Sequence, residues 1–579
     1  MNKNLLFLFV VFFSLSFQSQ NVQQKLPLKK LPEFLTENTP WADSLIQQMS
    51  LEQKIGQLFN VAAYSNKGEK HQEELLEQIE KFGIGGITFF QGGPQRQARL
   101  TNLYQAKSKV PLMVAMDAEW GLSMRIDSTM KYPWQMTLGA IKDESLIEEM
   151  GKQIGEQCRR LGVHVSFSPV IDVNNNPENP VIFARSFGEN RENVARKGIA
   201  YMKGLQASKV IACAKHFPGH GDTDTDSHIR LPVVNHSKKR LDSIELYPFK
   251  RLVNSGIASV MTAHLNLPQL MHGDKNASSL NSTIVDTILK QELGFKGLIF
   301  TDGLNMGGVA KYQKSAQIDL QAIKAGNDVL LLSQDVEATI ELIKQEIKNG
   351  NLTEEQITNS AHKILKAKEW LGIHRGDPVD LENLITDLNK AEYDYLNRKL
   401  VEASLTLVRN EKKIIPIKKL KQTKIIHLAL AEKEVGYRHF QQGLNRYARV
   451  DTLHYTSLPV SEQKSLMDTL LQYDKVIVSV HKSNKHPWVS AELDTEFKNF
   501  INLLRLKKEV ILTVFANAYS LKDFLAAEYV PALLMSYQNS DLAQDLSAQL
   551  LFGGIQAKGN LPVSASSTIK QGMGVLGDL

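Results

Sequence analysis

Short apolar runs alternate with longer amphipathic stretches between about residues 40 and 375 of the chain. We predict buried strands at seven runs: Ile84–Phe90, Pro111–Met116, His164–Phe167, Val210–Ala214, Ile257–Met261, Leu298–Phe300 and Val329–Leu332. Between them, segments such as Glu144–Arg160 and Asn190–Ala207 have helical periodicity. Alternation of strands and helices over this length predicts parallel strands joined by crossover helices.

Polar residues directly follow many of these runs. They include Asp117, Ser168, Lys215 with His216, His264, and Thr301 with Asp302. Polar residues at the carboxyl ends of many successive parallel strands are typical of the active face of a (β/α)8 barrel. An open doubly wound sheet would instead gather them at one switch point. We therefore predict an α/β fold with an N-terminal (β/α)8 barrel of the TIM type at residues 40–375.

A second set of apolar runs follows a charged, weakly periodic stretch at residues 376–398, which we interpret as a linker. The runs are Ile425–Leu430, Val476–Val480, Val510–Phe515 and Ala532–Met535. They also alternate with helical stretches, so we predict a smaller C-terminal α/β sandwich domain at residues 399–579.

The first residues of the chain have the pattern of an export signal. Lys3 precedes an apolar run from Leu5 to Phe13, and small and polar residues follow from Ser14. This order predicts a secretory signal peptide at residues 1–20. Because the apolar run is shorter than the roughly 20 residues of a membrane span, we expect an exported protein, periplasmic or secreted. We expect no integral membrane segment after signal removal.

Composition narrows the classes of function. The 579 residues carry a mild net charge of +6. No stripe of Lys and Arg with interleaved aromatic residues stands out, so we do not expect a nucleic-acid partner. Only two cysteines occur, Cys158 and Cys213, both in apolar stretches. We interpret them as buried free thiols, and their number excludes a cysteine-based metal site.

The most informative stretch is the polar segment, residues 215–228, with the sequence KHFPGHGDTDTDSH. Pro218, Gly219 and Gly221 exclude a regular helix, so we predict that the whole segment is a loop. So many titratable groups are costly unless water, a metal or a substrate satisfies them. Three interpretations stay open: acid/base catalysis with substrate binding, a polar structural loop, or a metal site. The ligands of the metal site would be His216, His220, Asp222 and His228.

Two carboxylates and a histidine are the candidates for catalysis. Asp226 lies two residues from His228, and a carboxylate that accepts one imidazole N–H raises the basicity of the other nitrogen. Such a dyad donates and recovers a proton near neutral pH, and a glycine-rich loop would let it swing over a substrate. Asp302 follows an apolar run at the mouth of the predicted barrel, although alone it is equally consistent with a helix N-cap.

These motifs resemble those of glycoside hydrolase family 3. The resemblance rests on the polar segment, on Asp302 after its apolar run and on Arg185-Ser186-Phe187, and it covers residues 45–565. The Asp-Ser-His sequence at residues 226–228 is similar to the loop motif of the bacterial β-N-acetylglucosaminidases in this family. The resemblance implies a retaining exo-β-N-acetylglucosaminidase that acts on cell-wall or chitin-type glycans.

The resemblance also implies the roles of individual residues. Asp302 would be the nucleophile that forms a covalent glycosyl-enzyme, His228 the general acid/base and Asp226 its partner. The terminal sugar would be held by Asp117, Arg125, Arg185, Lys215, His216 and His264. We expect a carbohydrate substrate as the partner, no metal, no organic cofactor and a monomeric protein.

Several alternatives stay open. The Asp-Ser-His motif disfavours a β-glucosidase or β-xylosidase of the same family, because those relatives take their acid/base from the second domain. A His–Asp dyad in place of a carboxylic acid would repel an anionic acceptor less, so an N-acetylglucosaminide phosphorylase is a further alternative. Outside this class, the alternatives are a metal-dependent hydrolase and a non-enzymatic sugar-binding protein.

Overall fold

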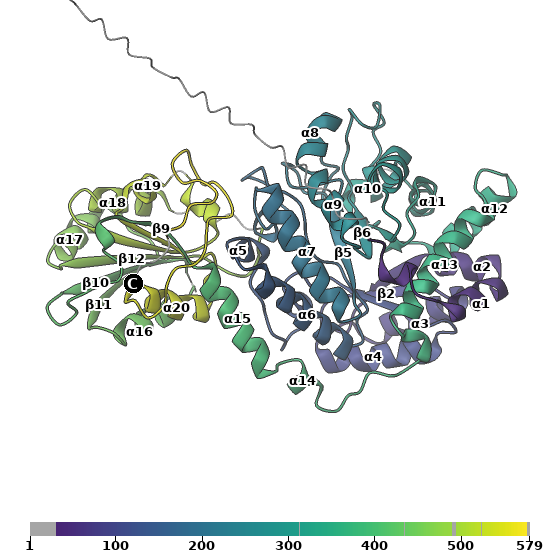
Figure 1. Cartoon of the computed structure of the whole chain (residues 1–579), viewed down its shortest axis with the longest axis horizontal. Helices are drawn as coiled ribbons and strands as arrows, with labels where there is room; N and C mark the ends of the chain where they lie inside the picture. Colours follow the sequence, from purple (N-terminus) through teal and green to yellow (C-terminus); the bar gives the residue numbers. More distant parts are fainter. Residues whose placement is uncertain (1–29, 312, 434, 489–493, 523, 576–579) are drawn as a thin grey trace, which may run out of the picture.

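The computed structural model describes residues 30–575 except 312, 434, 489–493 and 523. The predicted signal peptide lies outside the described residues. The barrel and the second α/β unit lie next to each other along the longest axis of the molecule (Figure 1). No helix in the described part of the chain is long and apolar enough to cross a membrane.

Eight parallel strands form the predicted barrel. They are β1 (Phe59–Ala63), β2 (Gly86–Phe89), β3 (Met113–Met116), β4 (Val165–Ser166), β5 (Ile211–Phe217), β6 (Ser259–Thr262), β7 (Leu298–Thr301) and β8 (Leu330–Leu331). Their order in the sheet is β7-β6-β5-β4-β3-β2-β1-β8. The Thr301 N–H donates to the Val329 carbonyl at 3.0 Å, so β7 also contacts the chain leading into β8 and the sheet nearly closes on itself. The predicted (β/α)8 barrel is confirmed.

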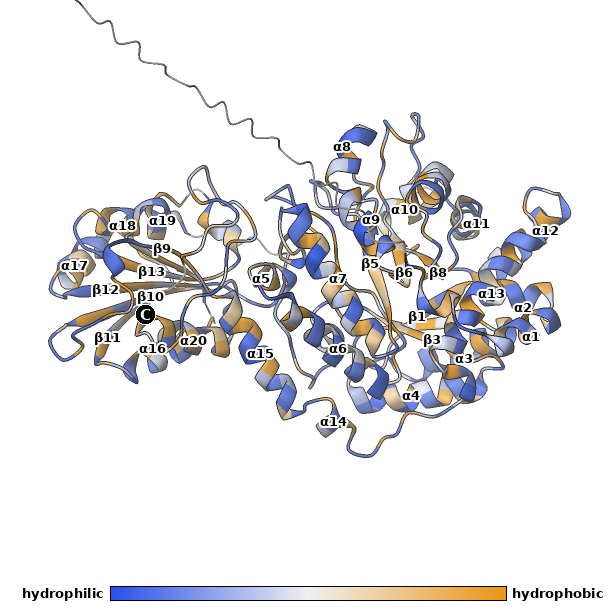
Figure 2. Ribbon diagram, in the orientation of Figure 1, coloured by the Kyte–Doolittle hydropathy of each residue, from blue (hydrophilic) through white to orange (hydrophobic). Residues whose placement is uncertain are grey.

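Helices cover the outside of the barrel and turn their polar faces to solvent (Figure 2). The principal ones are α3 (Glu69–Phe82), α4 (Pro94–Lys107), α6 (Glu144–Arg160), α7 (Arg191–Ala207), α9 (Leu246–Asn254), the π-helical segment Thr283–Glu292, α11 (Ser315–Ala325) and α13 (Glu354–Trp370). Additional helices are α1 (Pro40–Gln48), α2 (Leu51–Gly56), α5 (Gln135–Gly139), α8 (Lys238–Ser243), α10 (Gly307–Ala310) and α12 (Val336–Lys348). Helix α6 has the predicted bounds. Helix α7 begins one residue later than predicted, because Asn190 is its N-cap and accepts the N–H groups of Glu192 and Asn193.

Two features of the barrel differ from the sequence-based expectation. Strand β1 was not among the predicted strands, because Asn60 interrupts its apolar pattern; this buried side chain accepts a hydrogen bond from Thr88. The prediction that the loop begins at residue 215 is wrong. Strand β5 continues through Phe217, which is buried and pairs with Thr262 of β6, so Lys215 and His216 lie on a strand.

The second unit is a six-stranded mixed sheet with helices on both faces. Its strands are β9 (Thr406–Asn410), β10 (Ile425–Ala431), β11 (Val450–Tyr455), β12 (Lys475–His481), β13 (Val510–Phe515) and β14 (Ala532–Met535), in the order β11-β10-β12-β13-β14-β9. Only β9 is antiparallel to its neighbour. The helices are α16 (Arg438–Asn445) and α20 (Asp541–Leu551) on one face, and α17 (Val460–Leu470), α18 (Thr495–Leu504) and α19 (Leu525–Tyr529) on the other. The predicted α/β sandwich is confirmed.

The two units are connected by helix α15 (Ala391–Ser404) and by buried polar contacts. Helix α14 (Leu384–Asp387) precedes α15, and the boundary predicted at residue 398 falls inside α15. Gln538 of the second unit accepts hydrogen bonds from the Trp134 backbone N–H and the Thr137 hydroxyl, both at 2.8 Å. A buried donor left without its acceptor costs about 1–3 kcal/mol, so these contacts favour one relative placement of the two units.

Candidate active site

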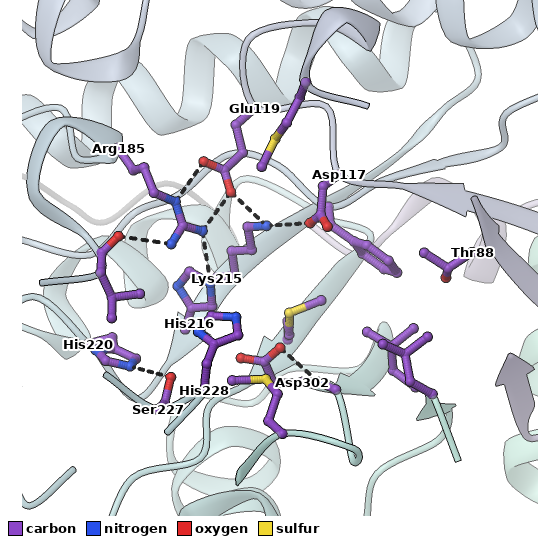
Figure 3. A pocket seen from close by; sticks show the side chains of 18 of the residues that line it. Thr88, Asp117, Glu119, Arg185, Lys215, His216, His220, Ser227, His228 and Asp302 are labelled. Atoms are coloured by element: carbon purple, nitrogen blue, oxygen red, sulfur yellow. Dashed lines mark hydrogen bonds and ion pairs between the residues drawn. The ribbon is translucent and has the colours of Figure 1, made fainter. Parts of the chain in front are cut away.

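The carboxyl ends of the barrel strands surround a pocket of about 460 Å³ (Figure 3). Eight of the nine predicted site residues line it: Asp117, Arg125, Arg185, Lys215, His216, Asp226, His228 and Asp302. They lie on β5, at the end of β7 and on the loops that follow β3, β4 and β5. Because the carboxyl ends of parallel strands meet at one end of a barrel, side chains far apart in the sequence converge here.

A set of charged side chains forms one wall of the pocket (Figure 3). Lys215 Nζ donates to Asp117 at 2.8 Å and lies 2.9 Å from Glu119 Oε1. The Arg185 guanidinium donates to both oxygens of Glu119, at 2.9 and 2.6 Å. Arg125 donates to the second oxygen of Asp117. We call these five residues the charged network.

The charged network stays ionised because each buried group lies beside an opposite charge. Burial alone would raise the pKa of Glu119, but Arg185 and Lys215 lower it by more, to about 2. Burial also acts to raise the pKa of Asp117, and Lys215 and Arg125 hold that pKa far below its usual range. Conversely, burial acts to lower the pKa of Lys215, and the two carboxylates raise it above its ordinary value. The network therefore presents charged hydrogen-bonding groups that need no rearrangement to bind hydroxyls.

Asp172, which was not among the predicted site residues, orients His216. Its Oδ2 lies 2.7 Å from His216 Nδ1, and its carboxylate also accepts the His216 backbone N–H. Burial acts to raise the pKa of Asp172, and the neighbouring His216 holds it below the ordinary value, so the group is ionised and can only accept. Nδ1 therefore carries a proton, and Nε2 lies 3.4 Å from the Arg185 guanidinium.

Asp302 stands at the end of β7 and faces the pocket. Its Oδ1 accepts the backbone N–H of Gly303 at 2.8 Å. Burial alone would raise the pKa of this carboxyl, but the nearby His216, His264 and His228 lower it by more, to below its usual range. The carboxylate is therefore ionised at neutral pH, which is the state in which it can act as a nucleophile.

Asp226 and His228 are paired at the rim of the same pocket. Asp226 Oδ1 lies 2.8 Å from His228 Nδ1 and also accepts the backbone N–H of His228 at 2.8 Å. The His228 side chain is 63% exposed and contributes to the pocket wall. With Nδ1 held by the carboxylate, Nε2 is left to exchange a proton with a molecule in the pocket.

His264, the ninth predicted residue, lies behind the Asp302 loop. It is fully buried and is not among the described residues that line the pocket. Its Nδ1 lies 2.7 Å from the Ser279 hydroxyl, and its Nε2 lies 3.0 Å from the Gly303 carbonyl. Since a carbonyl only accepts, Nε2 carries the proton. His264 thus holds the backbone immediately beside Asp302.

The four residues of the metal alternative do not converge. Over the described ranges, they form no group of three whose ligand atoms lie within 4.8 Å of one another. Asp222 instead pairs with His236 at 2.7 Å, next to Glu245. Both oxygens of Glu245 accept hydrogen bonds from Arg240, so a guanidinium already satisfies the buried carboxylate of this second group.

Aromatic side chains that were not predicted complete the pocket wall. Tyr64 and Phe90 stack with ring centroids 5.1 Å apart, and the Arg125 guanidinium lies 5.0 Å from the Phe90 ring centre. Trp488 comes from the second unit. The adjacent Pro487 accepts the Ala184 backbone N–H at 3.2 Å, which holds this loop against the barrel. Aromatic faces beside fixed polar groups suit a ligand with both apolar faces and hydroxyls.

Comparisons with known proteins agree with this geometry. The family model described as "Glycosyl hydrolase family 3 N terminal domain" matches residues 50–367. Beta-hexosaminidase A of Pseudoalteromonas piscicida is 29% identical over 443 residues, which cover 71% of this chain and 73% of that protein. A beta-hexosaminidase of Neisseria meningitidis serogroup C is 33% identical over 275 residues, covering 46% of this chain and 74% of that protein.

A solved structure extends the similarity to both units. The glycoside hydrolase family 3 beta-N-acetylglucosaminidase from Paenibacillus sp. str. FPU-7 is 28% identical, with a TM-score of 0.73. The match covers 90% of this chain and 100% of that one. The fold, the site and these relatives define a glycoside hydrolase that acts on O-glycosyl bonds. The chain belongs to glycosyl hydrolase family 3.

The charged network generates a prediction about stability. Glu119→Gln keeps the shape of the side chain but removes the negative charge beside Arg185 and Lys215. We expect this to lower the free energy of unfolding by about 3–5 kcal/mol at pH 7. The pKa of Glu119 is lower in the folded state than its ordinary value of 4.5. The contribution of the Glu119 charge to the free energy of unfolding is therefore complete above pH 4.5 and is lost as the pH falls toward 2.

Urea unfolding of the Glu119→Gln variant and the wild type tests this. The gap between their unfolding midpoints should narrow as the pH is lowered below about 4.5. The control is Glu74→Gln, which alters an exposed pair with Lys70 at 3.9 Å and should shift the midpoint little. A gap that is independent of pH, or as small as that of the control, would contradict the stated role of Glu119.

Proposed function

We propose that this chain is an exported, retaining exo-β-N-acetylglucosaminidase that acts on cell-wall or chitin-type glycans. The observation that carries the proposal is that Asp302 and the Asp226–His228 pair line one pocket from different elements. Two relatives named beta-hexosaminidase and a solved beta-N-acetylglucosaminidase with both units support the substrate class. The charged network and His216 would bind the hydroxyls and the acetamido group of the terminal sugar.

The first half of the proposed reaction forms a covalent glycosyl-enzyme. The Asp302 carboxylate attacks the anomeric carbon while the bond to the glycosidic oxygen breaks. His228 enters this step as an imidazolium, with Nδ1–H donated to the Asp226 carboxylate and Nε2–H directed at the leaving oxygen. That oxygen takes the Nε2 proton and departs as an alcohol, so no alkoxide has to form.

The second half reverses the roles. His228 is now neutral, with a lone pair on Nε2, and it removes a proton from a water molecule that attacks the anomeric carbon. The bond to Asp302 breaks, and the sugar leaves with its original configuration after two inversions. Asp226 stays ionised throughout and stabilises the imidazolium at each end of the cycle, as the buried carboxylate does in a hydrolytic triad.

Removal of the nucleophile tests the reaction. Asp302→Ala should abolish turnover of an aryl β-N-acetylglucosaminide, because no covalent intermediate can form. Incubation of the wild type with a fluorinated N-acetylglucosaminyl fluoride, which slows release of the intermediate, should add the mass of one sugar to the peptide that contains Asp302. Peptide mass spectrometry is the measurement.

The same assay separates the alternatives. If an aryl β-glucoside or an aryl β-xyloside is cleaved faster than the N-acetylglucosaminide, the chain is a β-glucosidase or β-xylosidase. A rate that depends on inorganic phosphate, with a sugar 1-phosphate as the product, would favour phosphorolysis. Loss of activity on chelation, restored by zinc, would favour the metal-dependent alternative. Retained activity in the Asp302→Ala variant would remove Asp302 from its role.

The dyad makes a different prediction, about leaving groups. In the His228→Ala variant, the rate of glycosyl-enzyme formation should fall by about 10²–10⁴-fold for substrates with a poor leaving group, because departure of that alcohol needs the proton. A dinitrophenyl substrate, whose leaving group needs no proton, should slow far less in the step that forms the intermediate. Stopped-flow measurement of the first turnover with both substrates checks this, and equal losses would argue against an acid role for His228.

Export is proposed from the pattern of residues 1–20. Expressed with its own N-terminus in a bacterial host with an outer membrane, the protein should reach the periplasm or the medium, shortened by about 20 residues. Cell fractionation and the intact mass are the measurements. Deletion of residues 1–20 should keep the protein in the cytoplasm, and a full-length product confined to the cytoplasm would overturn the export proposal.

A further inference from the structure

Exposure alternates along the three residues of the Asp-Ser-His motif. The side chains of Asp226 and His228 are 32% and 63% exposed, whereas Ser227 between them is only 2% exposed. A polar side chain this deeply buried needs hydrogen-bond partners. Its partners connect the motif to two other parts of the site.

The first partner is His220, the buried histidine of the polar segment. Its Nε2 lies 3.0 Å from the Ser227 hydroxyl, and its Nδ1 lies 2.8 Å from the Thr223 hydroxyl (Figure 3 shows the Ser227 contact). Because Thr223 donates its own proton to the His220 carbonyl, it accepts from Nδ1–H. Burial lowers the pKa of His220 to about 4, so the ring is neutral at pH 7. Nε2 therefore accepts the Ser227 O–H.

His220 is in turn fixed to the floor of the site. Its backbone N–H donates to Asp172 Oδ1 at 2.7 Å, and the other oxygen of Asp172 holds His216. Its carbonyl also accepts a hydrogen bond from the Asn179 side chain at 2.8 Å. The Ser227 hydroxyl is thus tied, through one neutral ring, to the carboxylate that orients a sugar-facing histidine.

The second partner is the segment that follows Asp302. The backbone N–H of Gly308 donates to the Ser227 carbonyl, and that of Gly307 donates to the His228 carbonyl, both at 3.1 Å. A Cβ atom on Gly307 would lie 2.7 Å from the His228 carbonyl oxygen, and one on Gly308 would lie 2.9 Å from the Ser227 carbonyl oxygen. Only residues without a side chain allow this approach of the two backbones.

We propose that Ser227 is the anchor that positions the His228–Asp226 dyad over Asp302, through its hydroxyl to His220 and its carbonyl to Gly308. Ser227 touches no reacting atom in this scheme, so it is a positioning residue. The inference deepens the function proposed above and rests on it. The dyad itself is a local pair within three residues, so it survives loss of the anchor. What is lost is the placement of Nε2 relative to the scissile oxygen.

This mechanism separates proton delivery from nucleophilic attack. A proton donor that is displaced by about 1 Å can lose on the order of 10²-fold in rate. The Asp302 carboxylate is held by Gly303 and the barrel strand, and the sugar would be held by the charged network. Loss of the anchor should therefore lower kcat for poor leaving groups and leave KM and the first turnover of activated substrates nearly unchanged.

The first test is Ser227→Ala in the full chain. We expect kcat for a substrate with a poor leaving group to fall by roughly 10–100-fold. The first turnover of a dinitrophenyl N-acetylglucosaminide should change less than about threefold. Thr225→Ala is the matched control, because it removes a hydroxyl from the same loop, and within the described part of the chain that hydroxyl contacts Asp224 and Arg230 rather than His220. It should leave both rates unchanged.

Gly307→Ala tests the backbone contact between the dyad and the segment that follows Asp302. Alanine is preferred over glycine inside a helix, and Gly307 begins α10, so this change should not unfold the protein. The new Cβ would displace the His228 carbonyl, and we expect the same selective loss on poor leaving groups. This variant decides the question if Ser227→Ala does not fold, as judged by thermal unfolding.

The outcomes distinguish this inference from the proposed function. A selective loss in His228→Ala with none in Ser227→Ala and Gly307→Ala would overturn the anchor and leave the acid/base role intact. Equal losses on both substrates in the anchor variants would show a structural role only, which also overturns it. If His228→Ala shows no leaving-group dependence, the proposed function itself fails, whatever the anchor variants do.

Discussion

The rest of this site depends on the burial of charge at the mouth of the barrel. Glu119 and Lys215 are at most 2% exposed, and each would be prohibitively costly there without its partners. Lys215 satisfies two carboxylates from β3's loop at once, and Arg185 brings the loop after β4 onto the same cluster. These ion pairs join three separate barrel segments, so the charged groups of the wall are already in position before any ligand arrives.

The polar segment carries out two tasks that differ in their mechanical demands. Its first residues continue strand β5, so Lys215 and His216 inherit the rigidity of the barrel. Its last residues, Asp226 and His228, lie on a loop at the rim of the pocket, from where a proton donor can reach a bound ligand. His220 lies between the two parts and contacts both, through Asp172 and through Ser227. A residue that is not among the nine predicted site residues therefore links the two halves of the segment.

Prediction from sequence succeeded where both sides of a strand are buried. Runs such as Val476–Val480 and Val510–Phe515 are almost entirely apolar, because helices cover both faces of the sheet. Strand β11 was missed because it is an edge strand, and its exposed residues give it a polar composition. The resemblance and the strand-end pattern together identified eight of the residues that line the pocket, among them the candidate nucleophile and the acid/base pair.

The residues that were missed act through partners distant in the sequence. Glu119 pairs with Arg185 66 positions away, and Asp172 with His216 44 positions away. Asp172 lies between apolar residues and Glu119 lies two residues after Asp117, but neither position indicates which basic group the carboxylate pairs with. The sequence shows Ser227 only as the middle residue of a motif, because its burial between two more exposed neighbours depends on the folded structure.

One consequence follows from the loop of the second unit that reaches the barrel through Pro487 and places Trp488 in the pocket wall. A ligand that contacts walls from both units gains affinity only while the two stay docked. Binding and docking are then thermodynamically linked, so occupancy of the pocket protects the smaller unit against unfolding as well as the barrel. A ligand that reached Trp488 would in this way make the second unit part of its binding site.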